Sequence, residues 1–205
     1  MDFDRLAARL AGRVPEPIGM KARYAVLVPL AEVDGRMHLI YEVRAATLRR
    51  QPGEICFPGG AAERGEDAVT CALRETSEEL GLAPDRVRVM TGLDFLYTRD
   101  RALIEPVLGV LDAEAARSVK PCADEVAEAF FVPVDELSSM EPFEYRYEVV
   151  PRIPSDFPYE RLQLSRDYAW RSGKTAGSAY LWRDKVIWGI TGAITRHVLE
   201  LLREG

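Results

Sequence analysis

The stretch Gly60–Leu82 reads GAAERGEDAVTCALRETSEELGL, and this order of residues decides the fold. We predict a helix over about Glu66–Leu80, because acidic residues open it where the helix dipole is positive. Gly81 follows as a C-terminal cap, and Pro84 prevents the helix from continuing. The stretch therefore predicts a glycine-rich turn that leads into one acidic helix.

Three acidic side chains recur on one side of the expected helix. Glu75, Glu78 and Glu79 stand at i, i+3 and i+4, which places their carboxylates within about 6 Å of one another. Acidic helix faces are often simply exposed to solvent and bind no ion, and the three acids taken alone favour this alternative. The Gly59-Gly60 pair before the helix favours metal binding instead, because glycine lets main-chain carbonyls approach an ion. We predict that the three carboxylates and the Gly60 carbonyl hold a hard divalent cation, Mg²⁺ or Mn²⁺.

The same stretch resembles the Nudix box, the signature of Nudix hydrolases. The matching positions are Gly60, Glu66, Arg74-Glu75-Thr76, Glu78-Glu79 and Gly81-Leu82. An aliphatic residue is commoner where Thr76 stands, but its β-branched side chain packs similarly. The resemblance implies an α+β fold, a Nudix-type α/β/α sandwich with a mixed central β-sheet, and metal-dependent hydrolysis of a diphosphate. Under it, Arg74 orients Glu75, with Glu66 and Gly81 as supporting residues.

Residues upstream are similar to a second signature, that of coenzyme A pyrophosphatases within this superfamily. They are Arg44-Ala45, Arg49, Gly53 and Phe57-Pro58-Gly59-Gly60. The match is partial, since Ile40-Tyr41-Glu42 stands where a Leu-Leu-Thr type of strand end is usual. The resemblance spans about residues 22–202 and implies cleavage of coenzyme A or acyl-CoA to adenosine 3',5'-bisphosphate and (acyl-)4'-phosphopantetheine. The alternatives are another nucleoside diphosphate derivative, such as ADP-ribose, NADH or a diadenosine polyphosphate, and a catalytically inactive ligand-sensing module.

A basic cluster precedes the glycine turn. It consists of Arg44, Arg49 and Arg50. We expect these guanidinium groups, together with Gly59, to meet the substrate phosphates that a metal does not reach. The alternative is that they form weak surface ion pairs with Glu42 or Glu54. The reaction also needs a base to take a proton from water, for which Glu75 and Glu125 are both candidates.

The rest of the chain indicates one domain over residues 1–205, with a helical extension at 1–20. The expected strands are Tyr24–Leu30, Met37–Val43, Val87–Tyr97, Leu103–Leu111, Val126–Val132 and Ala179–Leu181. Three further helices are expected. The first begins at Phe3 and ends by Gly12, the second covers Val134–Leu137, and the third covers Ile187–Leu202. The proline- and aromatic-rich segment from Met140 to Pro158 is expected to be an ordered loop or an irregular strand pair.

Composition limits the class of partner. Apolar residues make up 47% of the 205 residues and the net charge is −6, which favours a globular fold and disfavours nucleic acid or anionic membranes as partners. The cysteines, Cys56, Cys71 and Cys122, show no CxxC spacing and suit a reducing compartment. No targeting segment is visible, so we expect a cytoplasmic enzyme with a small-molecule substrate. The superfamily resemblance adds a possible homodimer.

Overall fold

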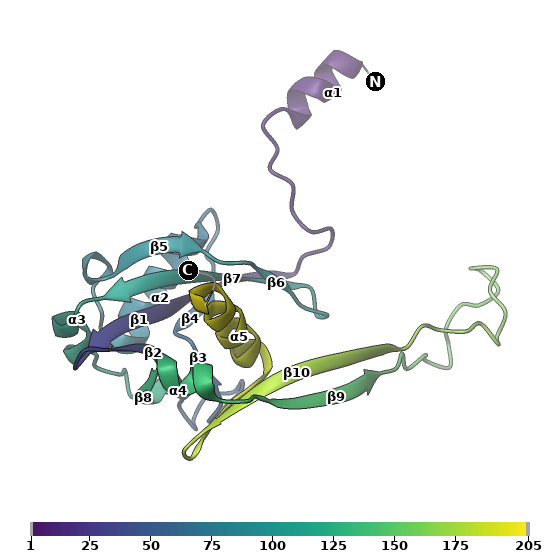
Figure 1. The fold of residues 1–205 in the computed structure, drawn as a ribbon. Coiled ribbons are helices and arrows are strands. Elements are labelled where there is room, and N and C mark those ends of the chain that lie inside the picture. Colours follow the sequence, from purple (N-terminus) through teal and green to yellow (C-terminus); the bar gives the residue numbers. More distant parts are fainter. Residues whose placement is uncertain (1, 204–205) are drawn as a thin grey trace.

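A mixed β-sheet organises residues 2–203, which the computed structural model describes (Figure 1). Its main path has the strand order β3-β2-β1-β7-β5, with β4 paired to β1, β6 to β7 and β8 to β2. The strands are β1 (Ala22–Val33), β2 (Arg36–Arg44), β3 (Ile55–Cys56), β4 (Gly59–Ala61), β5 (Arg88–Gly92), β6 (Leu96–Tyr97), β7 (Ala102–Leu111) and β8 (Val126–Pro133). Strand β1 runs parallel to β7 and antiparallel to β2 and β4, so the predicted mixed sheet is confirmed.

The helical segments of residues 2–203 are α1 (Phe3–Leu10), α2 (Ala68–Leu80), the 3-10 turn η1 (Pro84–Arg86), α3 (Ala113–Arg117), α4 (Val134–Ser139) and α5 (Gly189–Arg203). Helices α2 and α5 pack against opposite faces of the sheet. Side chains alternate along β2: Ile40 joins the core cluster beneath α2, whereas Tyr41 joins the cluster beneath α5. The Tyr41 hydroxyl is hydrogen-bonded to Thr195 Oγ1 of α5 at 2.9 Å. The predicted α/β/α sandwich is therefore confirmed.

A long hairpin extends from the sandwich. Strand β9 (Phe143–Val149) pairs with β10 (Gly173–Trp182), which also pairs with β11 (Lys185–Ile187). Figure 1 shows β9 and β10 reaching away from the main sheet. The sequence predicted only Ala179–Leu181 of β10, because the residues before them carry little apolar or β-branched character. Pairing overrides this weak propensity: Gly177 leaves space for the Tyr145 ring, which a Cβ would meet at 2.4 Å.

Other differences from the predicted elements are local. The predicted strand Val87–Tyr97 is two strands, β5 and β6, which pair with β7 separately and are divided by residues 93–95. The predicted last helix starts at Gly189, since Ile187 pairs with Tyr180 in the hairpin. The sequence did not predict β3, β4 or α3. Helix α1 matches its prediction and buries no residue, and Figure 1 shows it away from the sheet. Within residues 2–203, no helix combines the length and apolar character needed to cross a membrane.

Candidate active site

Helix α2 carries the predicted acidic residues, and both of its ends are fixed by the sequence. The Asp67 carboxylate accepts a hydrogen bond from the Thr70 amide at 2.8 Å, which caps the first turn. Gly81 takes a left-handed conformation with φ of 66°, and its amide donates to the Ser77 carbonyl at 3.1 Å. The predicted helix is confirmed, except that it starts two residues later. Glu66 therefore lies in the loop before the helix.

The two glycines before α2 allow a close approach between strand β4 and its neighbours. Gly59 pairs with Val26 of β1, and a Cβ on it would lie 2.3 Å from the Ala25 carbonyl oxygen. A Cβ on Gly60 would instead lie 2.3 Å from the Glu75 Oε2 atom of α2. Both distances are far shorter than any normal contact. The missing side chain of Gly60 therefore makes room for the Glu75 carboxylate directly against the turn.

Arg74 joins three of the acidic side chains. Its Nε donates to Glu66 Oε1 at 3.0 Å, and its Nη1 donates to Glu75 Oε1 at 2.8 Å and to Glu78 Oε2 at 3.3 Å. The hydrogen bonds from Arg74 hold the pKa of Glu66 at about 2. The same contacts raise the pKa of Arg74 itself, so the group stays fully charged. The structure thus brings together Glu66, Arg74, Glu75 and Glu78.

Replacing Arg74 with lysine tests this arrangement. Lysine keeps the charge but cannot span three carboxylates, because it lacks the planar fork of donors. We expect Arg74→Lys to lower kcat about tenfold with little loss of thermal stability. Steady-state kinetics and a melting curve on the same preparation measure both effects. An unchanged kcat would contradict an orienting role for Arg74.

Two buried carboxylates, on α2 and on the sheet, influence each other electrostatically. Glu79 is 3% exposed, and its Oε2 accepts from the Gly59 amide at 2.8 Å. Glu42 of β2 is 0% exposed, and its Oε1 accepts from the Cys56 thiol at 3.3 Å. Burial is the first cause that raises the pKa of each, and for Glu79 the charge of Glu42 is the second. The negative charges of these two carboxylates therefore repel each other.

Glu42 is not among the site residues predicted from the sequence. It was named there only in the alternative that the arginines form surface ion pairs, and its complete burial excludes that alternative for Glu42. The available signal was an acidic residue in the apolar run MHLIYEV, at Met37–Val43. Ile40 faces α2, so the strand alternation of period two places Glu42 on the same face.

The other predicted site residues lie at the end of β2, on the loop that follows it and on the loop before β8. The Ala45 amide donates to the Glu125 carbonyl at 2.8 Å, which ties the loop after β2 to the loop before β8. The Arg44 charge lowers the pKa of Glu42 and the Glu125 charge raises it, so both side chains lie near the buried pair. Arg49 and Arg50 are exposed. Within residues 2–203, none of these three arginines forms an ion pair with an acidic group within 4.0 Å.

The donor set fits a hard divalent cation, although the side chains do not already surround one. In the part of the chain that the structure describes, no group of three or more acidic, histidine or cysteine side chains converges on a metal position. Arg74 accounts for part of this, because it holds Glu75 and Glu78. The donors are carboxylate oxygens, which suit Mg²⁺ or Mn²⁺ better than zinc. A cation would also relieve the repulsion that raises the pKa of Glu79.

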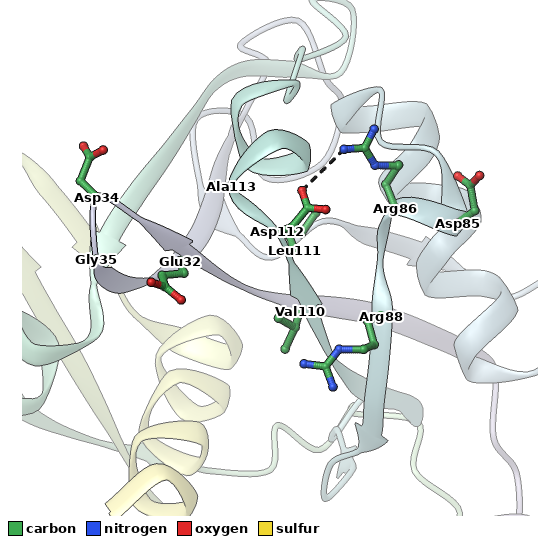
Figure 2. A pocket seen from close by; sticks show the side chains of 10 residues that line it. All are labelled: Glu32, Asp34, Gly35, Asp85, Arg86, Arg88, Val110, Leu111, Asp112 and Ala113. Atoms are coloured by element: carbon green, nitrogen blue, oxygen red, sulfur yellow. Dashed lines mark ion pairs between the residues drawn. The ribbon is translucent and has the colours of Figure 1, made fainter.

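A cavity of about 850 Å³ lies elsewhere, at the far end of β1 (Figure 2). Ala25, beside the glycine turn, and Glu32, which lines the cavity, are seven residues apart on β1, or roughly 23 Å in an extended strand. Figure 2 shows Arg86 reaching toward Asp112 at its wall, with Nη2 and Oδ1 3.5 Å apart. Its lining mixes acidic and basic groups and includes none of the predicted site residues. We therefore place the candidate active site at α2.

The glycine turn, the capped acidic helix and the mixed sheet between two helical layers together define a Nudix domain. The NUDIX domain family matches residues 21–153, so the chain belongs to this family. It is 44% identical over 115 residues to peroxisomal coenzyme A diphosphatase NUDT7 of Mus musculus; the match covers 55% of this chain and 48% of that protein, about half of its length. It is 32% identical to mitochondrial coenzyme A diphosphatase NUDT8 of Homo sapiens, over 96% of this chain and 76% of that protein. Nudix hydrolase 3 of Caenorhabditis elegans is 30% identical, with 87% and 72% covered.

Proposed function

We propose that the chain is a metal-dependent pyrophosphohydrolase that cleaves coenzyme A or acyl-CoA to adenosine 3',5'-bisphosphate and (acyl-)4'-phosphopantetheine. One observation carries the proposal: carboxylates gather on and beside α2, directly against the glycine turn. Nudix hydrolases generally need a divalent metal, and the donor set suits one. The choice of coenzyme A is supported by relatives named coenzyme A diphosphatases and by the arginines after β2.

Each residue then has a defined task. Glu75, Glu78 and Glu79 hold Mg²⁺ or Mn²⁺, with the Gly60 carbonyl as a fourth donor. A bound ion would neutralise charge on the diphosphate oxygens and make a water molecule more acidic. Arg74 keeps the Glu75 carboxylate oriented through its 2.8 Å hydrogen bond.

Two residues, Glu75 and Glu125, are candidates for the base that accepts the water proton. One oxygen of Glu75 is engaged by Arg74, and the other lies against Gly60. Glu125 is exposed on the loop tied to Ala45, and its carboxylate has no ion-pair partner among residues 2–203. We therefore assign the proton-accepting role to a carboxylate oxygen of Glu125.

The arginines after β2 provide the test of substrate recognition. Among residues 2–203, Arg44 and Arg49 have no acidic group within 4.0 Å, and we expect their guanidinium groups to bind the phosphates of coenzyme A. We expect Arg44→Ala and Arg49→Ala to raise KM about tenfold and to change kcat much less. Arg152→Ala, another exposed arginine, is the matched control and should leave both constants unchanged. A fall in kcat with an unchanged KM would contradict this role.

The experiment that tests the function compares substrates directly. Purified protein is incubated with Mg²⁺ and, in separate reactions, with coenzyme A, ADP-ribose, NADH and diadenosine polyphosphates, and the products are identified by mass. We expect coenzyme A to be the best substrate and to yield adenosine 3',5'-bisphosphate. Cleavage of ADP-ribose without cleavage of coenzyme A would instead favour the second candidate, a Nudix hydrolase of another nucleoside diphosphate derivative.

The remaining features of the proposal concern organisation. We propose one Nudix domain over residues 1–205, with residues 1–20 as a helical extension and the C-terminal helix predicted at 187–202 as part of the fold. The enzyme is proposed to be cytoplasmic and homodimeric, with a small-molecule substrate. Size-exclusion chromatography with light scattering measures the oligomeric state.

A further inference from the structure

Glu42 has no role in the function proposed so far, although its position is unusual for a carboxylate. It is 0% exposed, and its Oε2 atom has no hydrogen-bond partner among residues 2–203. Its other oxygen accepts only the weak thiol donor of Cys56. A buried carboxylate without compensation costs several kcal/mol of stability, so a partner is expected at the free oxygen.

The strand geometry places the Glu42 side chain on the face of the sheet that the acidic helix covers. Its strand neighbour Ile40 belongs to the core cluster that contains Cys71 and Leu80 of α2, so Glu42 points to the α2 side of the sheet. Its pairing partner on β3 is Cys56, three residues before the glycine turn. The buried Glu79 carboxylate reaches that same turn from α2, through its hydrogen bond to the Gly59 amide.

The neighbouring charges leave one kind of partner for this oxygen. Glu42 and Glu79 are not hydrogen-bonded to each other, so they do not share a proton in this arrangement. The Glu75 and Glu125 charges also act on Glu42, whereas the Arg44 guanidinium, whose charge acts in the opposite sense, donates through Nε to the Arg50 carbonyl at 3.4 Å. A small cation between carboxylates would satisfy the free oxygen and remove the repulsion.

We propose that Glu42 is a further metal-binding carboxylate, which with Glu79 holds a divalent cation between β2 and α2. The inference rests on the proposed function, because it extends the same acidic site across to the sheet. The predicted metal-binding residues lie on β4 and α2, whereas Glu42 lies on β2, so it supplies an oxygen from a third element. Carboxylate and main-chain oxygens are the ligands that Mg²⁺ and Mn²⁺ prefer.

The test measures Mn²⁺ binding to the full chain without substrate, by electron paramagnetic resonance of free Mn²⁺ during a titration. We expect Glu42→Gln to weaken Mn²⁺ affinity at least tenfold, or to remove one bound ion. In EDTA the same variant should melt at a higher temperature than the wild type, because an unpaired buried charge has been removed. Glu42→Thr, a β-branched residue suited to a strand, should behave in the same way.

Glu32→Gln is the matched control, since Glu32 is an exposed glutamate of the same sheet. It should bind Mn²⁺ as the wild type does. Wild-type Mn²⁺ affinity and stoichiometry in Glu42→Gln would overturn the inference and leave the proposed function standing. A Glu42→Gln chain that is less stable than the wild type in EDTA would also overturn it, because the carboxylate would then be structural. Failure of the wild-type chain to bind Mn²⁺ would contradict the proposed function itself.

Discussion

Glu79→Gln is expected to lower kcat by about a hundredfold or more, because it removes a charge that stabilises the transition state through the metal. Glu79 is buried and its Oε2 already accepts from the Gly59 amide, so the glutamine side chain fits the space and can rotate its oxygen toward that donor. Glu78→Gln should cause a similar loss, although the Glu78 side chain is 57% exposed and its Oε2 accepts from Arg74 Nη1. Steady-state kinetics with saturating Mg²⁺ measure both variants.

The control for these two variants is Glu114→Gln, which changes an exposed glutamate of α3. It carries the same chemical change and should keep the wild-type kcat. Melting curves separate a loss of turnover from a loss of fold. A rate near that of the wild type in Glu78→Gln or Glu79→Gln would remove that residue from the metal site.

The two glycines of the turn should respond to alanine in opposite ways. In Gly60→Ala, the new Cβ meets the Glu75 carboxylate, which can move as the end of a flexible side chain. We expect kcat to fall roughly a hundredfold, because a catalytic group is displaced, while the fold survives. In Gly59→Ala, the Cβ meets the Ala25 carbonyl oxygen at 2.3 Å and the Val26 Cα at 2.6 Å, which are backbone atoms. This variant should lose about 3 kcal/mol of unfolding free energy.

Urea unfolding of both glycine variants, together with kinetics of Gly60→Ala, distinguishes the two effects. We expect Gly60→Ala to be well folded with a low kcat, and Gly59→Ala to have a lower unfolding free energy than the wild type. If Gly60→Ala retained full activity, the Glu75 carboxylate would not need its place against the turn. If Gly59→Ala were as stable as the wild type, the close pairing of β4 with β1 would be incorrect.

Local signals in the sequence were sufficient to predict the centre of the site. The cap residues of α2 act through their own backbone hydrogen bonds, so Asp67 and Gly81 fix the helix within the segment that contains them. The i, i+3, i+4 spacing then fixes the side of the helix on which the acids lie, whatever the rest of the fold. The mixed sheet was also predicted, through the resemblance carried by these same residues.

Features that depend on contacts between distant segments could not be predicted in this way. The burial of Glu42 on the α2 side of the sheet depends on the packing of β2 beneath α2, which joins segments far apart in the sequence. The strand Gly173–Trp182 forms because Phe143–Val149 pairs with it, not because its own residues favour a strand. In both cases tertiary structure overrides local propensity.

The most direct measurement of the central claim is the location of a bound metal. Crystals soaked in MnCl₂ and measured for anomalous scattering should show a Mn²⁺ peak roughly 2–2.5 Å from carboxylate oxygens of Glu79 and its neighbours on α2. The absence of such a peak at α2, in crystals that diffract well at saturating MnCl₂, would contradict the claim that these acidic residues bind the catalytic metal.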